Sequence, residues 1–184
     1  MKKKKAKSKI IVLLCSIPLI FVLLLNLGIY LYPEHKIGHN NEVTIYDNSG
    51  KYAFTHHYYG LSKYVTLEEI SPYMEKCIIA SEDQRFYSHH GLDYRRIIAS
   101  IFGNLTSGSI VSGASTITQQ LARTIYLDNE KSIERKIKEA IIARKLEMTY
   151  SKEKILELYL NCVYFGHNIY GIDEASYYFF KKSS

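Results

Sequence analysis

The residues best suited to chemistry lie in four short segments between residues 82 and 161. The first reads EDQRFYSHHG and places two carboxylates, Glu82 and Asp83, at the end of an apolar helical run. The other three are GASTITQQ (113–120), RKIKE (135–139) and KILELYLN (154–161). A partly desolvated carboxylate can act as a general base, and cations with hydroxyl and amide donors can stabilise a negatively charged leaving group.

Each of these segments also has a structural explanation when it is taken alone. Arg135 and Glu139 are four residues apart, and a surface ion pair at this spacing contributes only about 0.3–0.5 kcal/mol. Ser115 and Thr116 have the side chains that favour the first position of a helix. The case for chemistry therefore depends on the segments occurring together.

Polar residues of the first and fourth segments are expected to have different roles. We expect Glu157 and Asn161 to cap or pair locally, so their role is largely structural. Glu82 is harder to explain in this way, because a carboxylate at the end of an apolar helix and beside Phe86 is costly to desolvate. An ordinary carboxylate at a helix end remains the alternative.

The elements that must position these residues are mainly helices. Apolar spacing and capping residues predict a short turn after Thr66 and a helix that starts near Ser71 and Pro72. Further helices are expected over residues 97–105, 115–127, 133–149, 151–160 and 174–180, with a flexible stretch over 106–114. Residues 43–47 and 51–55 flank a turn and predict a small β-hairpin.

The predicted helix over 133–149 is amphipathic, with Ile133, Ile137, Ile141 and Leu146 on its apolar side. Cys77 and Cys162 both fall within apolar helical runs, so we expect buried free thiols rather than a disulfide. No spacing of Cys and His resembles a zinc site.

The first 32 residues predict a membrane anchor. Residues 10–32 are uncharged and largely apolar, long enough to cross a bilayer as a helix, and six lysines precede them within residues 1–9. Positive charge beside a membrane helix stays on the cytoplasmic side, so everything after Tyr32 is expected outside. A cleaved signal peptide is the alternative, but an Ala-x-Ala cleavage site is missing.

Charge in the remainder of the chain is balanced. The sequence has 24 Lys and Arg against 18 Asp and Glu, and removing the six lysines of the tail leaves 18 against 18. A neutral domain argues against a uniformly basic face for nucleic acid, so no nucleic-acid partner is expected.

In order and spacing, the four segments resemble the first four signature motifs of glycosyltransferase family 51, the peptidoglycan glycosyltransferases. These enzymes are monofunctional or form the N-terminal half of class A penicillin-binding proteins. The resemblance runs from about Val43 to the end of the chain. It implies a lysozyme-like, mainly α glycosyltransferase domain with a small N-terminal β-hairpin, preceded by one transmembrane helix. The expected division is a basic tail (1–9), a transmembrane helix (10–32), a linker with the hairpin (33–64) and the glycosyltransferase domain (65–184).

The resemblance also assigns roles to individual residues. Glu82 matches the catalytic base, and Glu139 matches a second essential carboxylate that supports the diphosphate, directly or through a divalent ion such as Mg²⁺ or Mn²⁺. No cofactor is strictly required. Residues expected to bind the substrate are Asp83, Phe86, His89, Gly91, Gly113, Ser115, Thr116, Thr118, Gln119, Gln120, Arg123, Lys131, Arg135 and Lys136.

The reaction implied is the polymerisation of lipid II into β-1,4-linked glycan strands at the outer face of the bacterial cytoplasmic membrane. The expected partners are lipid II, the growing glycan strand, membrane lipid and other cell-wall synthesis proteins. Apolar residues at 101, 102, 105, 110 and 111 could enter lipid or form an ordinary core helix.

The chain also departs from the family pattern. Phe180 stands where the family usually has glycine. The further helices and the fifth motif of the family, which contains an arginine, are not found after residues 181–184, so the chain resembles a C-terminally truncated member of the family. The alternatives to a polymerase are a membrane-anchored lipid II-binding scaffold without activity and a lysozyme-like hydrolase. Basic residues suited to a diphosphate favour transfer, because a hydrolase has no diphosphate to stabilise.

Overall fold

A computed structural model describes residues 23, 27–31, 42–46, 52–57, 63–107, 113–127 and 132–183. The chain divides into two compact units, Met1–Glu34 and His35–Ser184. In the first unit, residues 27–31 are helical. None of the helices in the described ranges has both the length and the apolar character needed to cross a bilayer. Most of the predicted transmembrane segment lies outside the described residues.

The predicted β-hairpin is confirmed. Strands β1 (Glu42–Tyr46) and β2 (Tyr52–His57) pair in antiparallel register, with Thr44 opposite Thr55. The strands are rich in β-branched and aromatic residues, which favour the extended backbone.

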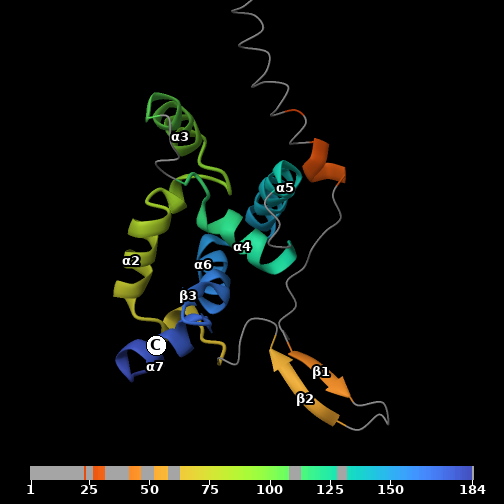
Figure 1. Cartoon of the computed structure of the whole chain (residues 1–184), viewed down its shortest axis with the longest axis vertical. Helices are drawn as coiled ribbons and strands as arrows, with labels where there is room; N and C mark the ends of the chain where they lie inside the picture. The colour runs from red at the N-terminus through yellow and green to blue at the C-terminus, as the bar shows by residue number, and fades with distance from the viewer. Residues whose placement is uncertain are drawn as a thin grey trace, which may run out of the picture. The chain divides into compact units, whose positions relative to one another are not determined.

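Helices form most of the second unit, as predicted (Figure 1). They are η1 (Leu67–Glu69), α2 (Pro72–Glu82), η2 (Phe86–Ser88), α3 (Tyr94–Ser107), α4 (Ile117–Tyr126), α5 (Ile133–Thr149), α6 (Lys152–Cys162) and α7 (Ile172–Phe180). The start and end predicted for α5 are confirmed, whereas α3 begins three residues earlier than predicted and α7 two residues earlier.

Local capping explains where several helices begin. Pro72 occupies the first turn of α2, where a missing backbone N–H costs nothing. Thr116 and Gln119 form a reciprocal capping box at the start of α4. Ser132 and Ser151 accept backbone hydrogen bonds at the starts of α5 and α6.

The core forms where α4 packs against both α5 and α6, which Figure 1 shows on either side of it. Its fully buried aliphatic side chains come from all three helices: Ile117, Leu121, Ile142, Leu146, Ile155, Leu156 and Leu160. Burying each such side chain contributes about 1.5–3 kcal/mol. Helix α4 is therefore held firmly, and it carries residues 117–120 of the second sequence segment.

The predicted apolar side of α5 is wrong in its first two turns. Ile133 and Ile137 are 83% and 48% exposed, whereas Glu139 is fully buried. From Ile141 onward the helix buries apolar side chains as expected. The N-terminal half of α5 therefore turns a charged residue, rather than its isoleucines, toward the interior.

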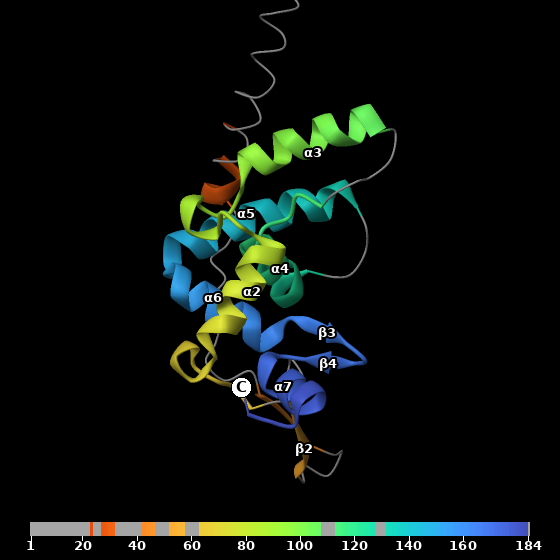
Figure 2. The same ribbon diagram turned by 90° about the vertical axis from the view of Figure 1, so that its left-hand side faces the viewer.

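A second hairpin was not predicted from the sequence. Strands β3 (Tyr164–Gly166) and β4 (Ile169–Tyr170) are joined by His167 and Asn168, which both have positive φ, at 51° and 62°. Two successive left-handed residues are typical of the type I′ hairpin turn. Figure 2 shows the hairpin beside α7, which contacts β4.

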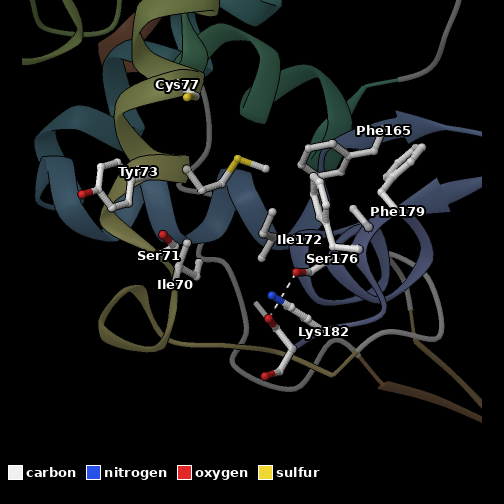
Figure 3. A pocket seen from close by; sticks show the side chains of 13 residues that line it. Ile70, Ser71, Tyr73, Cys77, Phe165, Ile172, Ser176, Phe179 and Lys182 are labelled. Carbon is white, nitrogen blue, oxygen red and sulfur yellow. Dashed lines mark hydrogen bonds between the residues drawn. The ribbon is translucent and has the colours of Figure 1, made fainter.

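An apolar groove of about 590 Å³ lies between α2 and α7 (Figure 3). Tyr73 and Cys77 line it from α2, and Phe179 lines it from α7. Cys77 is exposed in this groove, so the expectation that its thiol is buried is wrong. The expectation is confirmed for Cys162, where burial raises the thiol pKa to about 12.

Candidate active site

Glu82 is the last residue of α2 and is partly buried. Its Oε2 accepts a hydrogen bond of 2.8 Å from Nε2 of Gln120, and Oε1 of Gln120 accepts one of 3.3 Å from the hydroxyl of Tyr159. Within the described part of the chain, no cation forms an ion pair with Glu82. The carboxylate is thus oriented by a neutral donor and keeps part of its surface accessible.

The pKa of the Tyr159 phenol is affected by its burial and by the charges of Glu82 and Arg123. Burial raises the pKa of its phenol, the negative charge of Glu82 raises it further, and the positive charge of Arg123 lowers it. The phenol therefore remains a hydrogen-bond donor toward Gln120. Arg123 is partly buried in the last turn of α4 and has no ion-pair partner among the described residues.

Asp83 joins the end of α2 to the start of α4. Its side chain is fully buried and accepts hydrogen bonds from Nε2 of His89, at 3.0 and 2.9 Å, and from the backbone N–H of Ile117, at 3.1 Å. A carboxylate at a helix N-terminus is stabilised by the orphan N–H groups and the helix dipole. Asp83 and His89 thereby fix the two helices that carry Glu82 and Gln120.

Gly91 allows the loop after η2 to approach α5 closely. Its φ is +85°, and a Cβ placed there would lie 2.9 Å from the carbonyl oxygen of Ala143. Its own carbonyl accepts a hydrogen bond of 2.6 Å from Oγ1 of Thr116. Only glycine combines this backbone conformation with this approach.

Glu139 is fully buried and is paired with two cations. Nη1 of Arg135 lies 3.0 Å from one of its oxygens, and Nζ of Lys136 bonds to the other. The same ammonium donates a hydrogen bond of 2.7 Å to Oγ of Ser115. Arg135, Lys136 and Glu139 together carry a net charge of +1. The cluster is a positive group linked to the start of α4.

Besides Asp83, Gly91 and Thr116, three more of the residues predicted to bind the substrate lie in the interior. Phe86 is fully buried beneath Nζ of Lys152, which lies 4.3 Å from the centre of its ring. Thr118 is also fully buried and donates a hydrogen bond of 2.6 Å to Glu147. Gln119 is 3% exposed and serves in the capping box of α4. We assign these three side chains to packing and hydrogen bonding within the fold.

The remaining predicted residues are Gly113 and Lys131. Gly113 is exposed, and its carbonyl accepts a hydrogen bond of 3.2 Å from Nε of Arg96. Lys131 lies outside the described residues. The structural role expected for Asn161 is confirmed, but its partners are not only local: its side-chain amide bonds to both the N–H and the carbonyl of Val65, 96 residues away.

Sequence reasoning missed two residues that contact this site. Arg96 donates a hydrogen bond from Nη1 to the carbonyl of Glu82, and Tyr159 bonds to Gln120. Tyr159 lies inside the fourth sequence segment, so its position in that motif could have indicated a role at the site. The adjacent pair Arg95–Arg96 at the start of α3 was the only signal for Arg96.

The donor set at Glu139 does not suit a divalent ion. Both of its oxygens bond to cationic side chains. Among the described residues, no group of three or more His, Cys, Asp or Glu side chains converges as a metal site. The carboxylate of Glu139 is therefore a partner for the two cations and not a ligand for a divalent ion.

Comparison with known proteins identifies the family to which this chain belongs. The model of the transglycosylase family matches residues 50–184. Penicillin-binding protein 1F of Bacillus subtilis (strain 168) is 41% identical over 184 residues, which is 98% of this chain and 26% of that protein. Penicillin-binding protein 1A of Escherichia coli (strain K12) is 48% identical over 119 residues, or 65% of this chain and 14% of that protein.

A shorter relative is the biosynthetic peptidoglycan transglycosylase of Acinetobacter baylyi (strain ATCC 33305 / BD413 / ADP1). It is 44% identical over 117 residues, which cover 64% of this chain and 52% of that protein. The chain thus spans about half of this relative and about a quarter or less of the two penicillin-binding proteins. The resemblance inferred from the four segments is confirmed, and the chain belongs to the transglycosylase family, glycosyltransferase family 51.

Proposed function

We propose that this chain is a peptidoglycan glycosyltransferase that polymerises lipid II into β-1,4-linked glycan strands in cell-wall biosynthesis. Family membership and the names of the relatives support this activity. The observation that carries the proposal is the contrast between two glutamates: Glu82 bonds directly to Gln120 of α4, and Glu139 is linked to Ser115, ahead of α4, only through Lys136. Glu82 bonds to a neutral amide, whereas Glu139 holds two cations.

Glu82 acts as the general base in this proposal. The donor sugar is linked through an α bond to undecaprenyl diphosphate, and the product is β-linked, so the displacement inverts C1. The 4-hydroxyl of the acceptor forms the new bond to C1 while its proton passes to Glu82, and the bond from C1 to the diphosphate oxygen breaks. Gln120 orients the carboxylate for this transfer.

The leaving diphosphate requires positive charge that is already in place. Arg123, Arg135 and Lys136 supply it, and buried Glu139 fixes the last two in position. Preorganised cations stabilise charge that develops in the transition state without reorganising at the moment of reaction. Glu139 thus acts through Arg135 and Lys136, as a positioning residue.

The same proposal places the enzyme at the bacterial cytoplasmic membrane. Residues 10–32 would cross the bilayer once, with residues 1–9 inside and the catalytic domain, residues 65–184, outside after a linker over 33–64. An anchor suits a substrate whose polyprenyl tail stays in the bilayer. Besides lipid II and the glycan strand, the partners would be membrane lipid and other cell-wall synthesis proteins.

The test is polymerisation of labelled lipid II by the detergent-solubilised chain, with products separated by length on a gel. We expect polymer from the wild-type chain and a loss of about 100-fold or more for Glu82→Gln, since general base catalysis contributes about 10²–10⁴-fold. Glu153→Gln is the matched control, because Glu153 is an exposed acid in the first turn of α6. Polymer at the wild-type rate from Glu82→Gln, or cleavage of glycan instead of synthesis, would contradict the proposal.

A further inference from the structure

A second, polar hollow of about 580 Å³ lies where α2 ends and α3 begins. Figure 1 shows these two helix ends close together. Its charged lining consists of Arg85, Asp93, Arg95 and Arg96. Three guanidinium groups against one carboxylate give a net charge of +2, so the hollow favours an anion.

One of the three arginines is already neutralised. Nε and Nη2 of Arg85 donate to the two oxygens of Asp93, the former at 3.0 Å. Burial acts to raise the pKa of Asp93, but hydrogen bonds from Arg85 and from the backbone N–H of Arg96 outweigh it, and the pKa is lowered. Asp93 is therefore an ionised partner of Arg85.

The guanidinium groups of the other two arginines have no carboxylate partner within the described residues. Arg96 is held by backbone carbonyls only, those of Glu82 and Gly113, so its position is fixed while its charge is not neutralised. Arg95 is exposed on the adjacent position of α3. One fixed and one adjustable guanidinium thus border the same hollow, and guanidinium groups suit phosphate and carboxylate oxygens.

Glu82 connects this hollow to the candidate active site. Its carboxylate bonds to Gln120 on α4, while its backbone carbonyl bonds to Arg96 on α3. The proposed leaving diphosphate is served by the cations of α4 and α5. The hollow at α2 and α3 is a separate positive group next to the same base, so it is available to the second sugar substrate.

We propose that this hollow binds an anionic group, a phosphate or a carboxylate, of the acceptor molecule. The inference rests on the proposed function, in which a lipid-linked acceptor carries both a diphosphate and a peptide with free carboxylates. Binding that group would orient the acceptor while its 4-hydroxyl meets Glu82. Arg95 is then a substrate-binding residue, and Arg96 both binds the anion and fixes the end of α2.

A binding experiment tests the site without requiring turnover. The side-chain Nε–H signals of the arginines are followed by NMR in the detergent-solubilised chain during titration with inorganic diphosphate or with N-acetyl-D-Ala-D-Ala. We expect saturable shifts of Arg95 and Arg96 with one of the two probes, which identifies the anion as phosphate or carboxylate. Arg95→Ala should weaken this binding about tenfold, the effect of losing one charge-assisted hydrogen bond.

Lys76→Ala is the control, because Lys76 is an exposed cation on α2 that does not line the hollow. Equal weakening by Lys76→Ala, or no saturable shift of Arg95 and Arg96 with either probe, would overturn the proposal. A chain that binds a probe at this site but makes no polymer would contradict the proposed activity and leave the anion site standing.

A kinetic experiment adds a readout that a merely structural role would not change. For Arg95→Ala we expect the KM for lipid II to rise about tenfold with little change in kcat, and for Arg95→Lys a partial recovery. Wild-type KM in Arg95→Ala would overturn a role in acceptor binding.

Discussion

Glu82 and Glu139 are the same residue type in opposite surroundings. Glu82 ends a helix, is partly exposed and bonds to a neutral amide, whereas Glu139 is fully buried within α5 between an arginine and a lysine. Two cations make Glu139 a fixed counter-ion whose contribution is structural order. A single neutral donor orients Glu82 and leaves it free to accept a proton. The different roles proposed for the two glutamates therefore follow from their hydrogen-bond and ion-pair partners, since the residue type is the same.

Replacing Glu139 gives the largest effect on stability that this comparison predicts. Glu139→Gln leaves Arg135 and Lys136 without their carboxylate. Because these two cations are themselves 17% and 46% exposed, we expect a loss of about 3 kcal/mol, the lower end of the range for breaking a buried pair. The free energy of unfolding from denaturant titration measures the loss. Glu134→Gln, on the same helix, is the control, because Glu134 is 77% exposed and pairs only with Lys138 among the described residues. Equal stability of the two variants would contradict the buried cluster.

Gly91→Ala should give the next largest loss. The new Cβ would meet the carbonyl of Ala143 at 2.9 Å in a backbone conformation with φ of +85°, so we expect about 1–3 kcal/mol of destabilisation. Thermal unfolding is the measurement. Gly103→Ala is the matched control, since a Cβ there meets nothing within 4 Å and the position is helical. That variant should be unchanged or slightly more stable.

Gln120→Leu sharpens the description of Glu82. It removes the amide that orients the carboxylate, so the rate of polymerisation should fall about tenfold while stability changes little. Tyr159→Phe removes only the hydroxyl behind Gln120 and should lower the rate less. A larger loss of rate from Tyr159→Phe than from Gln120→Leu would contradict the proposal that Gln120 orients Glu82 directly and Tyr159 acts only through Gln120.

The smallest effect concerns Glu157, which anchors the segment before α2. Burial acts to raise its pKa, but hydrogen bonds from Lys154, Tyr64 and the N–H of Leu67 outweigh it and lower the pKa below 4.5. The stabilisation that ionised Glu157 provides is therefore fully present above about pH 4.5. It is lost as the pH falls through the lower pKa that Glu157 has in the folded protein. The free energy of unfolding, measured between pH 7 and 3, should depend less on pH in Glu157→Gln than in the wild-type chain. Identical pH profiles for both chains would contradict this.

The sequence predicted the parts of the fold that local signals control. Pro72 and Ser151 mark the starts of α2 and α6, because a first-turn proline and a capping serine act through neighbouring backbone groups. The hairpin of β1 and β2 followed from its alternating, β-branched strands. The second hairpin was missed, since nothing in the type of His167 required a positive φ.

The parts that could not be predicted depend on distant partners. The orientation of α5 follows from Glu139 and its link through Lys136 to Ser115, which lies 21 residues away. The role of Asp83 depends on the first N–H of α4, 34 residues along the chain. Periodicity assigned Ile137 to the buried side because an apolar residue is the usual choice there, and only tertiary pairing makes burying an acid favourable.

One paired measurement tests the division of labour between the two glutamates most directly. Glu82→Gln and Glu139→Gln are compared for polymerisation of lipid II and for the free energy of unfolding. Our account predicts that Glu82→Gln loses its activity at unchanged stability, whereas Glu139→Gln loses stability together with activity. A stable, inactive Glu139→Gln beside an active Glu82→Gln would reverse the assignment of the base and contradict the account.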